Sequence, residues 1–189
     1  PPAADGIFHP KIILQIGRHG ARAFVSSANL TAAGLAGNAE VSIEIECKDE
    51  DGPEREIVRS IWRYLNALVP SEPSPAREAL RWAGERAAWL DGPPGLVLQE
   101  LDDGSAIAFL HAPDEAGIGD HFVSFVGGDK VQSLVVISPY WDDDLSALAD
   151  LSRRLAPKRI ILPIDSTSHE FPTDAPFASK PRIVELGWP

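Results

Sequence analysis

The 189-residue chain is long enough for one domain of ordinary size, or for one and a half repeats of something larger. Its 44% hydrophobic and 24% charged residues are typical of a soluble globular protein, and no apolar run reaches the length of a membrane span. The net charge of −11 argues against a chain whose whole surface binds nucleic acid nonspecifically, but it allows a local basic groove.

The lone cysteine, Cys47, excludes an internal disulfide and a cysteine-rich zinc site, and it indicates a reducing, cytoplasmic setting. The absence of methionine and the Pro-Pro start predict a processed or excised segment, whose ends are not those of the gene.

Two runs near the start of the chain, residues 7–16 and 21–27, are separated by a short loop, which predicts an antiparallel β-hairpin. Because successive side chains alternate between the faces of a strand, His9 and Lys11 are expected on one face. The apolar residues between and after them are expected on the other face, in a core.

Polar residues continue after this hairpin. Ser27 and Asn29 are two residues apart and are expected to share one face of the second strand. Residues 30–35 predict a helical turn or two, ended by the glycines that follow. Residues 39–47 alternate apolar and polar side chains, as a half-buried strand does, so Glu40 is expected to begin a third strand.

The middle of the chain predicts two helices and a second hairpin. Apolar residues recur at helical spacing over residues 54–68. Ser74 followed by proline is typical of a capped helix start, which predicts a helix over residues 75–90. Two short strands, residues 96–101 and 105–111, are joined by an Asp-Asp-Gly turn.

The last third of the chain predicts a β-α-β unit. Residues 113–120 are expected to form an exposed loop, and the apolar run 131–137 a strand covered on both faces. Three aspartates, residues 142–144, precede a helical pattern over residues 145–155, where they suit the helix dipole and a capping role. With the strand 159–164, this unit favours parallel strands. The sequence as a whole therefore predicts an α/β (α+β) fold, and its last 25 residues are not assigned.

An ordered set of polar residues runs through the first 40 positions. The set reads His9-Pro10-Lys11, Ser27-Ala28-Asn29-Leu30-Thr31, Gly34, Asn38 and Glu40. It resembles the catalytic motif of the phospholipase D superfamily, the HKD phosphodiesterases, and is closest to the nuclease-like branch. The aspartate that usually lies five residues after the lysine is replaced by Ile16, as in several restriction-endonuclease-like members. The resemblance implies a mixed β-sheet flanked by helices.

The resemblance also implies a division of the chain. Residues 1–128 would be the motif-bearing part of a first repeat, and residues 129–189 the opening β-α-β part of a second repeat that lacks its own His-x-Lys. Superfamily members with two motifs build one active site from both, and members with one motif dimerise. The resemblance therefore implies a homodimer, or a second motif from a missing part of the same protein.

The implied reaction is metal-independent phosphodiester cleavage, without a cofactor, on DNA or RNA. His9 would attack phosphorus and form a phosphohistidine, and Glu40 would fix the ring tautomer through the other ring nitrogen. Lys11 would supply positive charge, and Asn29 and Ser27 hydrogen-bond donors, to the nonbridging oxygens.

Two arginines beside the motif, Arg18 and Arg22, are candidates for binding the anionic substrate. Ser26 competes with Ser27 for the hydroxyl role, and His19 fits a hairpin loop better than a catalytic role.

Other chemistry-bearing residues are better explained structurally. The remaining histidines have no lysine two positions on, and three helical tryptophans fit core packing or a covered interface better than base stacking. These residues are His111, His121, His169, Trp62, Trp82 and Trp89. Two other functions stay open: a noncatalytic module that binds nucleic acid or holds an assembly together, and a lipid phosphodiesterase. The second is weaker because no amphipathic membrane segment is evident.

Overall fold

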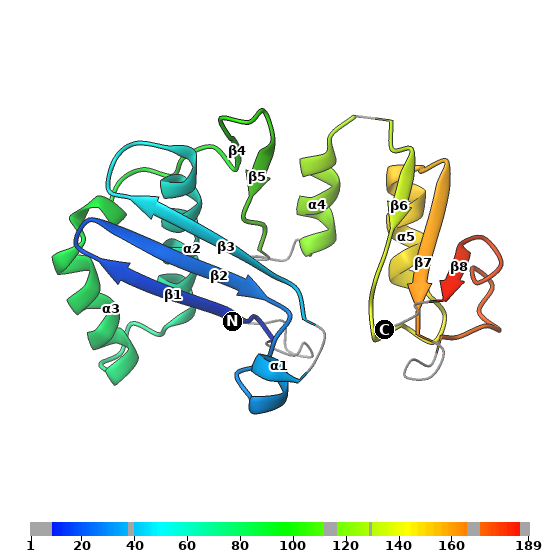
Figure 1. The fold of residues 1–189 in the computed structure, drawn as a ribbon, viewed down its shortest axis with the longest axis horizontal. Helices are drawn as coiled ribbons and strands as arrows, with labels where there is room; N and C mark the ends of the chain where they lie inside the picture. The colour runs from blue at the N-terminus through cyan, green and yellow to red at the C-terminus, as the bar shows by residue number, and fades with distance from the viewer. Residues whose placement is uncertain (1–8, 38–39, 112–116, 129, 166–170, 186–189) are drawn as a thin grey trace. The chain divides into compact units, whose positions relative to one another are not determined.

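The computed structural model describes residues 9–37, 40–111, 117–128, 130–165 and 171–185. The chain divides into two compact units, Pro1–Gly117 and Ile118–Pro189. The described residues form five α-helices and three small β-sheets (Figure 1), so the predicted mixed α/β class is confirmed. The predicted division into two repeats at residue 128 stays a prediction.

The first unit is built on a three-stranded antiparallel sheet. Its strands are β1 (Ile12–Gly17), β2 (Gly20–Ser26) and β3 (Ser42–Lys48), in the order β1-β2-β3. The predicted hairpin is thus confirmed, with Gly17 opposite Gly20 at its turn. Gly20 is required there, because a Cβ at this position would lie 2.5 Å from the carbonyl oxygen of Cys47.

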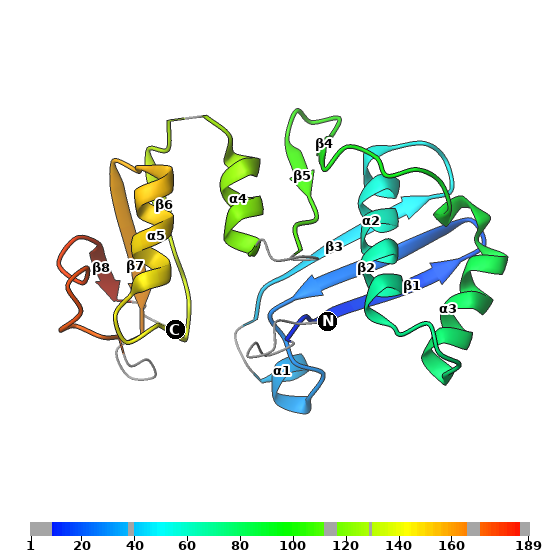
Figure 2. The same cartoon turned by 180° about the vertical axis from the view of Figure 1, so that it is seen from behind.

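Helix α2 (Pro53–Leu68) covers one face of this sheet; Figures 1 and 2 show it from both sides. Its apolar stripe and the inward residues of the sheet form the core of the unit, which confirms the helix predicted over residues 54–68. The most deeply buried members are Ala23, Ile57, Val58, Ile61, Ala87 and Leu90.

Helix α3 (Pro75–Arg86) begins as predicted, with the Ser74 hydroxyl accepting a hydrogen bond from the backbone N–H of Arg77 at 3.2 Å. It ends four residues earlier than predicted. The N–H of Ala87 bonds to the carbonyls of both Ala83 and Gly84, and the chain continues as a 3₁₀ turn, η1 (Ala88–Leu90). This change of direction lets Leu90 enter the core at 1% exposure.

The short elements of this unit are α1 (Ala32–Ala36), β4 (Leu98–Glu100) and β5 (Ala106–Ala108). Strands β4 and β5 pair antiparallel, as the Asp-Asp-Gly turn predicts, but over fewer residues.

The prediction that residues 39–47 form a half-buried strand is only partly right. Ile45 and Cys47 are buried in the core, whereas Val41 is 75% exposed and Ile43 is 55% exposed. All four share one side of the strand, since Ile43 is opposite Val25 and Ile45 is opposite Ala23. Only the second half of β3 therefore contributes to the core beneath α2.

The second unit contains a parallel sheet in the order β6 (Ser133–Val135), β7 (Arg159–Ile164) and β8 (Arg182–Glu185). Helix α5 (Ser146–Leu155) connects β6 to β7, so the predicted parallel β-α-β unit is confirmed. The prediction that residues 131–137 are covered on both faces is wrong, because Val135 is 54% exposed. The Val135 side chain lies on the face of the sheet opposite the core residues of β6 and β7.

Helix α4 (Ile118–Val126) also belongs to this unit, and its first turn overlaps the predicted loop 113–120, which is wrong from Ile118 onward. Phe122, Val123 and Val126 pack against the core of the unit. Among the residues that the structure describes, no helix is both long and apolar enough to cross a bilayer.

Two of the three aspartates before α5, Asp142 and Asp144, act as caps, as predicted. Oδ2 of Asp142 accepts a hydrogen bond from the N–H of Ala147 at 2.8 Å, and Oδ1 of Asp144 accepts one from the N–H of Ser146 at 2.9 Å. These contacts satisfy donors that the first turn of a helix leaves without partners.

Helix α5 ends at Leu155, and its C-cap residue Ala156 adopts a left-handed conformation with φ 44°. This conformation raises the free energy of any L-residue that has a Cβ atom, whereas glycine adopts it without that penalty. We therefore expect Ala156→Gly to raise the free energy of unfolding by about 0.5 kcal/mol. Ala149→Gly, inside the same helix, should instead lower it by about 1 kcal/mol. Urea titrations of both variants measure the difference, and a loss of stability in Ala156→Gly contradicts this account.

Candidate functional site

The predicted catalytic residues and Ser27 lie at the end of the sheet where β1 begins. Backbone hydrogen bonds continue past the strands there: the N–H of Ser26 bonds to the carbonyl of Lys11, and the N–H of Ser27 to the carbonyl of Val41, both at 3.0 Å. Three segments are thereby held side by side. His9 and Lys11 come just before β1 and Glu40 just before β3, so the prediction that these residues lie within the strands is wrong by one to three residues.

His9 and Lys11 are in direct contact. Nζ of Lys11 lies 2.6 Å from Nδ1 and 2.9 Å from Nε2 of the His9 ring. An ammonium can donate only to an unprotonated ring nitrogen, and a neutral imidazole offers one such nitrogen at a time. Because His9 is exposed, its ring is open to a substrate or a partner surface.

Ser27 and Glu40 form the second contact at this end of the sheet. The Ser27 hydroxyl lies 2.5 Å from Oε2 of Glu40, to which it donates, and accepts from the N–H of Val41 at 3.1 Å. The competing hydroxyl of Ser26 is used differently: it accepts from the N–H of Ala28 and donates to the carbonyl of Val41. Only the Ser27 hydroxyl thus contacts a predicted catalytic side chain.

Asn29 is held by a tight loop that leads into α1. Thr31 caps this helix by accepting a hydrogen bond from the N–H of Gly34 at 3.1 Å, and the N–H of Thr31 bonds to the carbonyl of Asn29 at 2.8 Å. Gly34 is buried against the Asn29 backbone, where a Cβ would lie 2.4 Å from the Asn29 oxygen. Thr31 and Gly34 therefore shape the loop that presents Asn29, whereas Asn38 lies outside the described residues.

The two predicted substrate-binding arginines are not part of this group. Arg22 lies four residues before Ser26 on β2, roughly 13 Å along the strand. It is paired with Glu46 at 3.1 Å and lies 3.9 Å from Glu44, both on the neighbouring strand β3. Arg18 lies farther still, in the turn between β1 and β2. The structure thus separates these arginines from His9, and it neutralises part of the charge of Arg22.

His19 lies in the hairpin turn as predicted, with Nδ1 2.9 Å from Oδ2 of Asp49. This hydrogen bond is the main cause that lowers the pKa of the exposed Asp49 carboxyl below its usual value. The other histidines lie elsewhere: His111 contacts the rings of Tyr64 and Phe109, and His121 is on α4. His169 lies outside the described residues.

Neither a metal cluster nor a cysteine nucleophile is evident in the described ranges. No three His, Cys, Asp or Glu side chains gather there in a way that could hold a metal ion. Cys47 is buried, and desolvation raises the pKa of its thiol above the usual value. A raised pKa disfavours the thiolate that nucleophilic chemistry requires.

Sequence reasoning missed one feature of the opposite, hairpin end of the sheet. Trp82 is 57% exposed, so of the two predicted roles core packing is wrong for this tryptophan and a covered interface stays a prediction, whereas Trp62 is buried as expected. The residues of α3 that pack against the core, Leu80 and Ala83, follow helical spacing, and Trp82 lies off that stripe. The spacing was the signal that could have identified it.

Comparisons of the chain with known protein families, with curated proteins and with solved structures find no match.

Proposed function

We propose that this chain is the motif-bearing half of a phospholipase D-like phosphodiesterase that cleaves nucleic acid without a metal. The observation that carries the proposal is the convergence of three separate segments, bearing His9 with Lys11, Ser27, and Glu40, at one end of a small sheet. The order and spacing of these residues along the chain, which resemble the phospholipase D motif, support the same phosphodiester cleavage.

The proposed reaction divides phosphodiester cleavage into two displacements. A ring nitrogen of His9 attacks phosphorus, and the bond from phosphorus to the leaving oxygen breaks as that oxygen takes a proton from an acid group. Water then attacks the phosphohistidine, the P–N bond breaks, and the histidine is regenerated. Lys11 is next to the ring, where its charge can offset the negative charge on the nonbridging oxygens.

Ser27 supports a positioning role for Glu40. The hydroxyl of Ser27 bonds both the Glu40 carboxylate and the backbone of Val41, so the carboxylate is held at the same end of the sheet as His9. A carboxylate held there can orient the imidazole and stabilise its positive charge after attack, as in a serine-protease triad.

The acid that protonates the leaving oxygen would be a histidine from a second motif. The exposure of His9 supports a site that is completed by another surface, either a second copy of this chain or a further segment of the same protein. The proposal therefore places half of an active site on this chain.

The test is hydrolysis of a labelled single-stranded oligonucleotide in the presence of a chelator. With the site completed by a second copy of this chain, we expect turnover by the parent protein and a loss of at least about 10³-fold in His9→Ala, since the nucleophile cannot be replaced by water at comparable speed. His19→Ala is the matched control, because His19 is also exposed but lies at the other end of the hairpin. Equal rates in the parent and His9→Ala contradict the assignment of the nucleophile.

The same assay separates the other functions. A noncatalytic module would bind the oligonucleotide equally well in the parent and His9→Ala and show no turnover in any oligomeric state. A lipid phosphodiesterase would hydrolyse phosphatidyl substrates and leave the oligonucleotide intact.

A further inference from the structure

We propose a second contact site for single-stranded nucleic acid at the hairpin end of the first unit, where a nucleobase stacks on Trp82 and a neighbouring phosphate pairs with Arg18. The proposal rests on the proposed function for its class of substrate, but it uses residues that take no part in the proposed chemistry.

Trp82 is exposed on a helix that does not need it for packing. Helix α3 attaches to the core through Leu80 and Ala83, while 57% of the Trp82 surface remains accessible. Large aromatic side chains are the usual platforms on which unpaired bases stack, because every base has a flat π-face.

Arg86 orders this indole. Its guanidinium carbon lies 4.3 Å from the centroid of the Trp82 ring, and its Nη1 donates to the carbonyl of Trp82 at 3.3 Å. An arginine over an aromatic face gives a cation-π contact and places positive charge next to the stacking surface. A ligand that offers both a flat ring and an anionic group fits this pair.

Trp82 and Arg86 line a shallow depression together with the turn between β1 and β2. Its volume is about 260 Å³, and Arg18 and Gly17 are among the residues that line it. This is slightly less than pockets for drug-sized ligands, which measure about 300–1,000 Å³, so the size suits a single base. Nε1 of Trp89 donates to the carbonyl of Gly17 at 3.4 Å, which ties the turn to the end of the helical segment.

The charges around the depression favour an anion despite the net charge of −11. Arg18 is exposed and takes part in none of the ion pairs found among the described residues. The nearest acidic partner of Arg86 is Glu85, at 3.9 Å, while Glu85 is held more closely by Arg81 at 2.9 Å. Arg18 and Arg86 can therefore meet a phosphate with little competition.

This site is remote from His9. Arg18 follows Lys11 by seven residues, roughly 23 Å along an extended strand, so a small phosphodiester cannot contact both ends of the hairpin. Substitutions at the depression should therefore weaken the binding of oligonucleotides. They should not change the rate at which a small substrate, such as bis(p-nitrophenyl) phosphate, is hydrolysed.

The experiment measures binding of a fluorescein-labelled oligothymidylate of about 12 nucleotides by anisotropy, within the range that single-strand sites cover. Trp82→Ala should weaken binding by about 10-fold or more, whereas Trp82→Phe, which keeps an aromatic platform, should retain most of the affinity. Arg18→Ala should weaken binding and reduce its salt dependence. Arg153→Ala removes the same charge from an exposed position on α5, which does not line the depression, and should stay within about twofold.

Unchanged affinity in Trp82→Ala, or no binding of the oligonucleotide by the parent, overturns the contact site. His9→Ala separates this result from the proposed reaction, because it should bind as the parent does and fail only in turnover. Loss of binding in Trp82→Ala without turnover in the parent supports the contact site and contradicts the catalytic proposal. Turnover that depends on His9, together with the parent's affinity in Trp82→Ala, supports the catalytic proposal and contradicts the contact site.

Discussion

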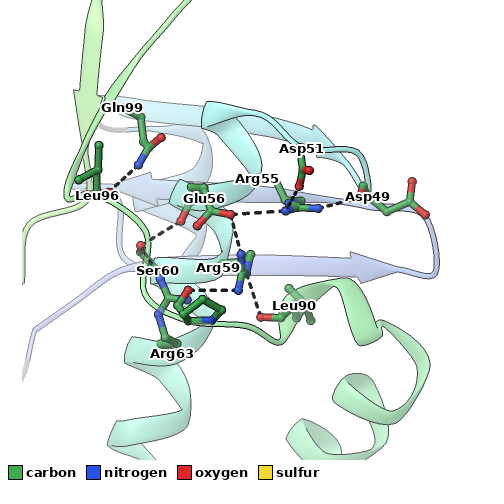
Figure 3. Close-up of polar contacts among 11 residues, drawn as sticks. Asp49, Asp51, Arg55, Glu56, Arg59, Ser60, Arg63, Leu90, Leu96 and Gln99 are labelled. Atoms are coloured by element: carbon green, nitrogen blue, oxygen red, sulfur yellow. Dashed lines mark hydrogen bonds and ion pairs between the residues drawn. The ribbon is translucent and has the colours of Figure 1, made fainter.

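Replacing Arg59 by methionine is expected to lower the free energy of unfolding by about 3 kcal/mol, although the two side chains have similar lengths. Arg59 lies on α2 and is only 5% exposed, an unusual position for a charged residue. Figure 3 shows it among the polar contacts between α2 and the chain from Leu90 onward.

Three contacts explain the size of this effect. Nη1 of Arg59 lies 2.6 Å from Oε1 of Glu56, Nε donates to the carbonyl of Leu90 at 3.3 Å, and Nη2 donates to the carbonyl of Pro93 at 3.3 Å. Methionine leaves both carbonyls and the Glu56 carboxylate without these donors. Breaking a buried ion pair lowers the free energy of unfolding by about 3–5 kcal/mol. Because Glu56 still has Arg55 as an ion-pair partner at 3.6 Å, we expect a loss at the lower end of this range.

Arg63→Met is the matched control for Arg59→Met. Arg63 lies one helical turn later, and the hydrogen bond found for it is from Nη2 to the hydroxyl of Ser60, at 3.2 Å. Burial, and then the charge of Arg59, lower the pKa of Arg63, so folding disfavours its charged form. Its replacement should change stability by no more than about 0.5 kcal/mol. Equal losses in the two variants, measured by urea titration, contradict the special role of Arg59.

Replacing Gly34 by alanine is expected to lower both stability and turnover. The added Cβ would lie 2.4 Å from the carbonyl oxygen of Asn29, and backbone atoms cannot move aside as the end of a side chain can. We expect a loss of about 1–3 kcal/mol in the free energy of unfolding. Displacement of Asn29 should lower turnover of the oligonucleotide by about 100-fold, because misplacing a substrate-positioning group by about 1 Å has effects of that size.

Gly37→Ala is the control for this loop. A Cβ at Gly37 would lie 3.4 Å from the carbonyl oxygen of Ala33, which is ordinary contact, so this variant should keep the parent's activity. Stability from urea titration and turnover rates are measured on both variants. A Gly34→Ala protein with the parent's stability and rate contradicts the role given to the loop.

Local periodicity predicted the helices and strands whose apolar residues recur at a regular spacing. The apolar stripe of α2, the alternating hairpin of β1 and β2, and the β-α-β unit through α5 were all found. The short helix α4 and the exposure of β6 were not predicted. In both, the decisive factor is which neighbours pack against a short apolar segment, and periodicity does not contain that information.

Some features of the candidate site were also predictable from spacing along the chain, and others were not. Spacing along the chain predicted that His9 and Lys11 share a face, and their side chains are in contact. Spacing could not predict that Arg22 is paired with Glu46, because the two are 24 residues apart and meet only through the register of β2 and β3. Ion pairing and burial depend on such distant contacts.

Periodicity along the chain was enough to predict the strands, the helices and the mixed α/β class. The resemblance of the motif supplied the residues of the candidate site: His9, Lys11, Ser27, Asn29 and Glu40. The distance of Arg18 and Arg22 from His9 and the exposure of Trp82 became clear from the folded chain. Side-chain periodicity is a property of one segment, whereas exposure and charge pairing are set by segments that folding brings together.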